Sequence, residues 1–236
     1  MLQYSVVIPA YNAQRTLRET LASVLHQTIP PAEIIVVDDG STDETAAIAP
    51  TLSPLIRVIH QANSGPGAAT TRGVRDTKAP WIAMSDADDL WLPHKMERQW
   101  EFLVAHPAVT LASAKMRQFR HGEIDDGTGE VRGGPTRSTI VVRRDVFLDV
   151  GDVVDPPGRS GEMVDWLARF RHQGHVMREL DEVLALRRVI AGSLSQRTSA
   201  KAGQGFLAVA HAALQRQRAA SASRASSPTV PNSSAG

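Results

Sequence analysis

Short apolar runs alternate with helix-like segments through the first part of the chain. The runs that predict strands lie at 4–8, 34–37, 56–59 and 81–84. After the first run, leucine and valine recur every three or four residues from Leu17 to Leu25, which predicts a helix with one apolar face. Because the strand runs are continuously apolar, they indicate a parallel sheet that is buried on both faces. The expected fold class is therefore α/β, a mostly parallel central sheet with helices on both faces.

Local signals set the ends of the other helices in this part. The stretch 41–44, Ser-Thr-Asp-Glu, has the spacing of a capping box and predicts a helix through about Ala49. A tight loop is expected at 63–67 and a helix at 68–74. Pro93 is suited to the first position of the helix that follows.

The pattern is weaker in the second part of the chain. Beyond a helix between Pro93 and Pro107, strands are expected at 109–116, 139–142, 175–179 and 183–187, and helices at 145–150, 162–173 and 205–218. One domain over 1–218 is expected, because a chain of 236 residues can build one sizeable core. From 219 to 236 the composition is mostly Ala, Ser, Pro and Asn, which predicts a disordered tail.

Charge and cysteine content exclude several classes of protein. The 26 basic and 25 acidic residues give a net charge of +1, and no long basic run is present, so we expect no nucleic-acid partner. The absence of cysteine excludes disulfides, thiolate metal ligands and a cysteine nucleophile, and it fits a reducing compartment. No signal-peptide pattern opens the chain, and no apolar run approaches the roughly 20 residues of a membrane helix. A cytoplasmic protein without a transmembrane segment is expected.

Carboxylates directly follow two of the predicted strands. Asp38 and Asp39 follow the second run, and Asp86, Asp88 and Asp89 follow the fourth. Ligands of open α/β sheets bind outside the carboxyl ends of the strands. The Asp-x-Asp step from Asp86 to Asp88 would present hard oxygen ligands to a divalent cation and a phosphate group. The alternative is an acidic loop or helix cap that binds nothing.

A third acidic feature lies on the helix predicted from 162. Met163 and Trp166 belong to its apolar face, which leaves Glu162 and Asp165 together on the other side. Transfer of a group from a nucleotide diphosphate needs a cation for the departing diphosphate, a polar seat for the nucleotide, and a carboxylate base near the acceptor. The three acidic features can fill those three roles. The alternative for the helix pair is a solvated face.

Four stretches of the sequence resemble family 2 glycosyltransferases. They are VVIPAYN at 6–12, SVLHQT at 23–28, IVVDDGSTD at 35–43 and DADDLWLP at 86–93. The resemblance covers about residues 4–190. It implies a GT-A fold with a donor-binding half at about 1–95 and an acceptor half at about 96–200. It also implies a nucleotide-diphosphate sugar as donor, Mg²⁺ or Mn²⁺, and inversion at the anomeric carbon by a single displacement.

The resemblance assigns a nucleotide pocket to residues of the first two strands. Pro9, Ala10 and Tyr11 would line it, with Tyr11 against the base. Asp39 would accept a hydrogen bond from the base, as for uracil, so the donor is expected to be a UDP-sugar. Asp38 would help to shape the loop.

The resemblance also divides the roles within the acidic stretch. Asp86 and Ala87 are expected at the nucleotide, with Asp86 near the ribose and the metal. Asp88 would be the main metal ligand through the diphosphate. Asp89 would orient the loop or face the sugar.

Three departures from the family pattern concern the diphosphate and the base. The family often has Ala-Arg-Asn before a glycine, but this chain has Ala-Thr-Thr-Arg-Gly at 69–73. The usual arginine is therefore missing from its place, and Arg72 either substitutes for it or does not. The base is usually found six residues before an arginine, but six before Arg169 is Met163, which cannot take a proton. Glu162 and Asp165 flank it, and Glu162 is the preferred candidate, being nearest to the family's acidic pair. No histidine follows the late arginine pair at 187–188.

The sequence therefore predicts an inverting, metal-dependent glycosyltransferase. Its acceptor hydroxyl could belong to a saccharide, a lipid-linked saccharide, a peptide or a small molecule. The main alternative is a relative that binds a nucleotide sugar without catalysis, since the usual base is absent. A receiver-like signalling domain is disfavoured, because the third strand ends in His60 and Gln61 rather than in an aspartate.

Overall fold

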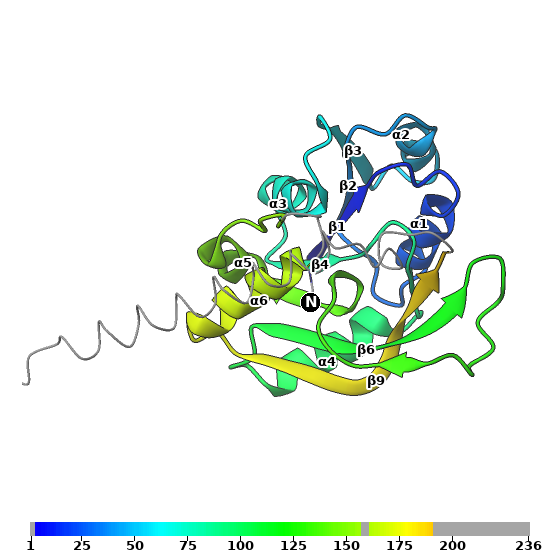
Figure 1. Cartoon of the computed structure of the whole chain (residues 1–236). Coiled ribbons are helices and arrows are strands. Elements are labelled where there is room, and N and C mark those ends of the chain that lie inside the picture. The colour runs from blue at the N-terminus through cyan, green and yellow to red at the C-terminus, as the bar shows by residue number, and fades with distance from the viewer. Residues whose placement is uncertain (1–2, 157–160, 191–236) are drawn as a thin grey trace, which may run out of the picture.

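The computed structural model describes residues 3–156 and 161–190 of the chain (Figure 1). The expected helix at 205–218 and the expected tail at 219–236 lie outside the described residues. None of the helices in the described ranges has both the length and the apolar character that crossing a bilayer requires.

The first part of the chain folds as four parallel strands with helical connections. Its elements are β1 (Tyr4–Ala10), α1 (Leu17–Leu25), β2 (Glu33–Asp38), α2 (Thr45–Ile48), the 3-10 helix η1 (Ala49–Thr51), β3 (Ile56–His60), α3 (Pro66–Asp76) and β4 (Trp81–Met84). The strands lie in the order β3-β2-β1-β4, and each neighbouring pair is parallel. The strand positions predicted from the apolar runs are confirmed.

The second part extends the same sheet with mixed directions. Its elements are β5 (Leu90–Trp91), α4 (Lys95–Ala105), β6 (Leu111–Arg120), β7 (Val131–Arg132), η2 (Arg137–Thr139), β8 (Val141–Arg143), α5 (Arg144–Val150), α6 (Glu162–His172) and β9 (Met177–Val189). The order continues as β4-β8-β6-β9-β5. Because β8 is antiparallel to both β4 and β6, and β9 is parallel to β6, the carboxyl ends of β4, β6 and β9 reach the same edge.

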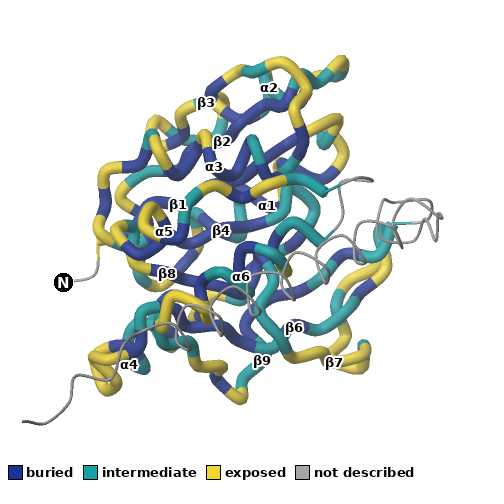
Figure 2. The backbone as a smooth tube through the Cα atoms, turned by 60° about the vertical axis from the view of Figure 1, so that its left-hand side comes forward, coloured by how far each residue is buried: buried dark blue, intermediate teal, exposed yellow. Residues whose placement is uncertain are grey.

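Helices cover both faces of the sheet, and the alternation along β1 shows which face each one covers. Val6 and Ile8 pack in a cluster with α1 and α4, while Val7 between them packs with α3, α5 and α6. Strands β1, β2 and β4 are almost wholly buried, dark blue in Figure 2. Trp166 and Met163 of α6 belong to the second cluster, so the methionine is part of the core.

Three expected helix starts are wrong by a few residues. The capping box at 41–44 does not form: α2 begins at Thr45, whose backbone N–H is 3.0 Å from Asp43 Oδ1 instead. Helix α4 begins at Lys95 rather than at Pro93, whose carbonyl accepts a hydrogen bond from Thr28 N at 3.0 Å. Helix α3 begins at Pro66, inside the stretch expected to be a loop.

The two closing strands expected at 175–179 and 183–187 are one strand, β9. Its pairing with β6 shifts register, since Ala114 pairs with Leu180 and the next residue pairs with Val183. The polar residues Asp181 and Glu182 form the bulge between them, and this polar interruption explains why the sequence indicated two strands. The strand expected at 139–142 also begins later, at Val141.

Candidate functional site

The carboxyl ends of β1, β2 and β4 meet at one edge of the sheet. Asp39 N donates to Ala10 O at 2.8 Å, and Ser85 N donates to Val7 O at 3.1 Å. The chain after each strand therefore lies beside the chain after its neighbours. Tyr11, which follows β1, is 52% exposed at this edge, although it is a large aromatic residue.

The acidic loop, residues 85–89, is fixed by contacts from two other segments. The carbonyl of Ala87 accepts hydrogen bonds from Thr16 Oγ1 at 2.9 Å and Thr20 Oγ1 at 3.1 Å, both at or near the start of α1. Ser138 Oγ in η2 accepts from Asp86 N at 3.0 Å and donates to Asp89 Oδ2 at 2.6 Å. The loop is thus held in one conformation before any ligand binds.

The second and third aspartates of the acidic loop have different surroundings. Asp89 is buried, and it accepts hydrogen bonds from Ser138 and from the backbone N–H of Arg188. Burial, together with Asp86 and Asp88, raises the pKa of Asp89 well above its usual range. Asp88 is half-buried and forms no ion pair with any described residue. Burial and the charge of Asp86 raise the pKa of Asp88 to about 6.

A buried arginine connects the acidic loop to α6. Arg137 in η2 forms ion pairs with Asp86 through Nη1 and with Glu162 Oε1 through Nη2, the latter at 2.6 Å. Its Nε donates to Thr70 Oγ1 at 3.2 Å. Burial alone would lower the pKa of Arg137, but the two carboxylates outweigh it and raise that pKa. The guanidinium is therefore a permanent cation between two carboxylates.

The two carboxylates predicted on α6 have separate partners. Glu162 reaches the acidic loop through Arg137, whereas Asp165 accepts from Arg169 Nε at 2.9 Å. Arg169 in turn donates to the carbonyls of Val150 at 2.6 Å and Asp152 at 2.5 Å, away from η2. The Arg137 ion pairs therefore connect Glu162 to the carboxyl edge of β4, whereas Arg169 connects Asp165 to the loop at 150–152.

The two aspartates after β2 are buried and hold the neighbouring loops. Asp39 accepts hydrogen bonds from Gln61 Nε2 at 2.7 Å, Ser64 N at 2.8 Å and Gly65 N at 2.8 Å. Asp38 accepts from Ser41 N at 3.1 Å and lies 3.2 Å from the His60 ring. A carboxylate has about four acceptor positions, and the loop after β3 fills about three of those of Asp39.

The sequence matches the model of one protein family. The sequence model described as "Glycosyl transferase family 2" matches residues 5–132, which is more than half of the 236 residues. The chain belongs to glycosyl transferase family 2.

Curated relatives of this family 2 chain include a Bacillus subtilis (strain 168) protein named "Putative teichuronic acid biosynthesis glycosyltransferase TuaG". The two are 36% identical over 204 residues, which cover 81% of each chain. An uncharacterised glycosyltransferase of Nostoc sp. is 41% identical over 169 residues, 68% of this chain and 50% of that one. One of Rickettsia bellii is 41% identical over 101 residues, 42% of this chain and 15% of that one. This chain thus spans half or less of the length of these last two relatives.

Solved structures share the fold of this family 2 chain. The S. aureus TarS 1-349 structure in complex with UDP-GlcNAc has a TM-score of 0.68 and 20% identity, covering 84% of this chain and 62% of that one. The complex of TarS with UDP has a TM-score of 0.65 and 21% identity, covering 80% and 61%. The fold is GT-A, as expected from the sequence.

The donor set of the acidic loop fits a cation that is bound jointly with a substrate. Among the described residues, no three histidine, aspartate or glutamate side chains converge in a way that would hold a metal by themselves. Asp89 is committed to Ser138 and the backbone, and Asp86 to Arg137, so Asp88 is the carboxylate best able to accept a cation. Magnesium-type ions commonly bind one or two carboxylates plus substrate phosphates. One available carboxylate is what such a joint site would need from the protein.

Three residues that organise the site were not identified from the sequence. Arg137 is 51 residues from Asp86 and 25 from Glu162, so no local pattern marks it. Arg188 was noted only as part of an arginine pair, yet its Nε donates to Asp88 O at 2.8 Å.

Asp155 is the third residue that sequence reasoning missed. It accepts from Gly67 N and Ala68 N, each at 2.9 Å, and so caps α3 from a distant loop. Gly65 has a φ of +104°, and a Cβ there would lie 2.6 Å from Asp155 Oδ2. Only glycine therefore fits at this position, next to the loop that Asp39 holds.

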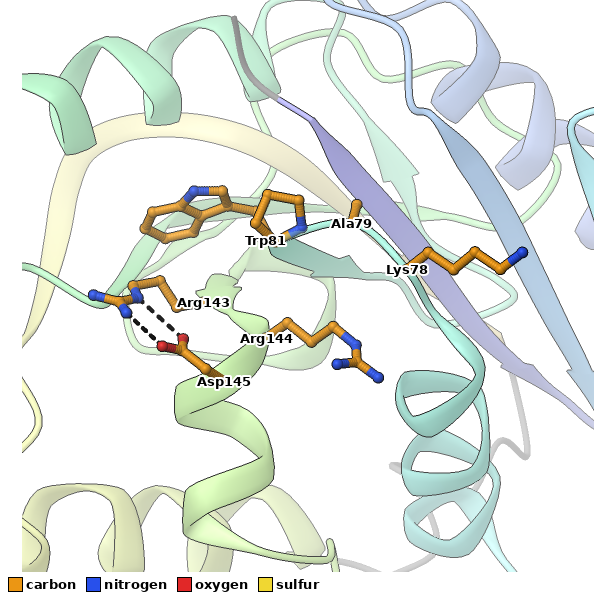
Figure 3. A pocket seen from close by; sticks show the side chains of 7 residues that line it. Lys78, Ala79, Trp81, Arg143, Arg144 and Asp145 are labelled. Atoms are coloured by element: carbon orange, nitrogen blue, oxygen red, sulfur yellow. Dashed lines mark hydrogen bonds and ion pairs between the residues drawn. The ribbon is translucent and has the colours of Figure 1, made fainter.

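A separate hollow of about 380 Å³ lies at the opposite edge of the sheet (Figure 3). Lys78, Trp81, Arg143 and Arg144 line it, and Asp145 pairs with Arg143. Strand β4 runs from Trp81 at this hollow to the acidic loop at its other end. The arginine pair of this hollow, residues 143–144, is thus remote from the acidic loop. Arg72 is on the exposed side of α3, where it pairs with Asp76.

The raised pKa of Asp88 predicts that removing its charge stabilises the ligand-free protein at neutral pH. The folded state binds the Asp88 proton up to about pH 6, whereas the unfolded chain releases it near pH 3.9. The stability that this proton contributes is present below pH 4 and is lost as the pH rises through 6. By urea unfolding, Asp88→Asn should exceed the wild type by about 1 kcal/mol at pH 7.5 and by only about a third of that near pH 4.5. The same difference at both pH values would contradict the prediction.

Proposed function

We propose that this protein is an inverting glycosyltransferase that moves a sugar from a UDP-sugar to an acceptor hydroxyl with the help of a divalent cation. The observation that supports it best is the chain of contacts from Asp86 through Arg137 to Glu162. It joins an acidic loop suited to a cation and a diphosphate to a carboxylate suited to act as a base. Both halves of a transfer site are therefore next to each other.

The donor would bind along the carboxyl edge of β1, β2 and β4. Tyr11, which directly follows Pro9 and Ala10, presents an exposed ring for the base, and the Asp39 carboxylate would accept a hydrogen bond from uracil. Asp86 and Ala87 would lie at the ribose and the diphosphate. The TarS complexes with UDP and UDP-GlcNAc have the same fold, which is consistent with a uridine nucleotide.

The acidic loop would hold the cation chiefly through Asp88, which has no competing ion pair with the residues at 3–156 and 161–190. Mg²⁺ or Mn²⁺ there would neutralise charge on the departing diphosphate. Asp89 and Ser138 hold the loop in the required shape, and Arg188 anchors it to β9.

Glu162 is the preferred base. The acceptor oxygen attacks the anomeric carbon, the bond from that carbon to the diphosphate oxygen breaks, and the diphosphate leaves with the electron pair. The proton of the acceptor hydroxyl passes to the Glu162 carboxylate. Asp165 is the alternative base, but its hydrogen bond to Arg169 directs it towards the loop at 150–152.

A second candidate function is nucleotide-sugar binding without transfer. The observation that favours it is Met163, which stands at the usual position of the base and is buried in the core. Slow release of sugar from the donor to water distinguishes the two functions, because an intact transfer site hydrolyses some donor and a binding module does not.

A thermal-shift screen of nucleoside diphosphates, with and without Mn²⁺, tests the donor site. UDP with Mn²⁺ should raise the unfolding temperature of the wild type more than either alone. Asp88→Ala should lose the part of the shift that depends on Mn²⁺, since it removes the carboxylate that accepts the cation. Asp149→Ala, an exposed aspartate on α5, is the matched control. If no nucleoside diphosphate gives a metal-dependent shift in the wild type, the proposed donor site is wrong.

A further inference from the structure

The segment 152–155 runs along α3 in the opposite direction and contacts it about once in each turn. The contacts are Asp155 with Gly67 N and Ala68 N, Val153 N with Thr71 Oγ1 at 2.9 Å, and Asp152 with Arg75. Residues four apart share one face of a helix, so the segment covers a single face of α3. The Asp155 contact is the one at the start of the helix, next to the loop after β3.

Two carboxylates meet Gly65, the residue just before α3. Asp39 Oδ2 accepts a hydrogen bond from Gly65 N at 2.8 Å, and a Cβ at Gly65 would lie 2.6 Å from Asp155 Oδ2. Asp39 Oδ1 also accepts from Ser64 N at 2.8 Å. Because the Asp39 carboxylate is bound to the backbone at 64–65, a shift of these residues would change the direction in which it points.

The contact of Asp155 with α3 uses both carboxylate oxygens. Oδ1 accepts from Gly67 N and Oδ2 from Ala68 N, each at 2.9 Å. These N–H groups belong to the first turn of the helix, where the backbone has no partner within the helix and a negative charge is favourable. A neutral amide has one acceptor oxygen and cannot replace both hydrogen bonds.

We propose that Asp155 is a positioning residue for recognition of the base. It fixes the first turn of α3 and Gly65, and through Gly65 it sets the direction in which Asp39 presents its carboxylate to uracil. This inference rests on the proposed function, in which Asp39 accepts a hydrogen bond from the base. It adds to the nucleotide pocket a residue from the second half of the sequence, which acts without touching the nucleotide.

The preference for uracil over cytosine measures the direction of Asp39. Uracil has an N–H donor at N3, where cytosine has an acceptor, while UDP and CDP carry the same diphosphate. Asp155→Asn should lower UDP affinity about fivefold, the effect of about one hydrogen bond, and leave CDP affinity unchanged. Isothermal titration calorimetry with UDP and with CDP, in the same buffer with Mg²⁺, measures both affinities.

A neighbouring aspartate of the same segment is the matched control. Asp152→Asn removes an equal charge, but Asp152 pairs with Arg75, which lies two turns further along α3 and is exposed. The ratio of UDP to CDP affinity in this variant should equal that of the wild type.

Gly67→Ala tests the same contact from the side of the helix and keeps the charge of Asp155. The added Cβ would lie 2.9 Å from Asp155 Oδ2, so the carboxylate must move away. Alanine favours the helix more than glycine does, so the helix itself is not weakened. This variant should lower the ratio of UDP to CDP affinity as Asp155→Asn does, and the double variant should lower it no further. Circular dichroism establishes that each variant is folded, and Gly67→Ala carries the test if Asp155→Asn is not.

The outcomes separate this inference from the function on which it rests. If the wild type prefers UDP and both variants keep that preference while their unfolding temperatures fall, Asp155 supports only the fold. The inference is then wrong and the proposed function stands. A wild type that binds UDP no more tightly than CDP overturns both the uracil contact of Asp39 and the role of Asp155.

Discussion

Glu162→Gln is expected to lower the rate of sugar transfer by about 10²- to 10⁴-fold, the range for loss of a general base. Glutamine is similar in size and keeps the contact to Arg137, so the fold and the donor site should survive. It cannot take the proton of the acceptor hydroxyl. Transfer is measured as nucleotide release that depends on the acceptor, with donor and Mn²⁺ at saturation, so that the change reports kcat.

The neighbouring carboxylate provides the matched control for this prediction. Asp165→Asn removes a charge three residues along the same helix, but that charge is directed to Arg169. Its rate should remain within a few-fold of the wild type. A normal rate in Glu162→Gln together with a large loss in Asp165→Asn would transfer the base role to Asp165.

The donor half of the fold was predictable because each of its elements has a local signature. The apolar runs at β1, β2 and β4 are continuous, and the apolar spacing of α1 is regular over its whole length. Helical crossovers make these strands parallel, so their carboxyl ends reach one edge. The juxtaposition of Tyr11 with the loop after β2, and the position of the acidic loop, follow from that topology alone.

The acceptor half was less predictable because its contacts join distant segments. Arg137 follows a glycine-rich connection and precedes a short strand, where an arginine is usually a solvated residue. Its burial results from two carboxylates that approach from β4 and α6, and neither has a local relation to it. The sequence placed Glu162 and Asp165 on one helix face, but it could not indicate that separate arginines direct them to separate places.

Arg188 shows how the same long-range effect fixes the acidic loop. It lies at the end of β9, and its side chain is 2% exposed. Besides Asp88 O, it contacts Glu19 Oε2 at 2.6 Å and lies 4.7 Å from the centre of the Phe119 ring. One side chain therefore connects the acidic loop to α1 and β6. The sheet order brings these segments together, because the carboxyl ends of β4, β6 and β9 share an edge.

Arg188→Met is expected to destabilise the protein by about 2 to 3 kcal/mol, because it leaves the carbonyl of Asp88 without its donor and removes the cation from the Phe119 ring. For a chain of this size the unfolding temperature should fall by about 4 to 12 °C. The Glu19 carboxylate is partly exposed, so water hydrates it when Arg188 is removed. The loss of stability is therefore smaller than for a fully buried ion pair. Calorimetry or thermal unfolding followed by circular dichroism measures the change.

The same substitution should also weaken the metal-dependent binding of UDP, since the Asp88 backbone is no longer anchored when its side chain must meet a cation. Arg178→Met is the matched control: it removes an equal charge from an exposed position near the start of the same strand. It should lower stability by less than about 1 kcal/mol. Arg188→Met could lower stability and still leave intact the Mn²⁺-dependent shift that UDP causes in the unfolding temperature. In that case Arg188 supports only the fold. The geometry of Asp88 is then set by Thr16, Thr20 and Ser138, and Arg188 is not needed for it.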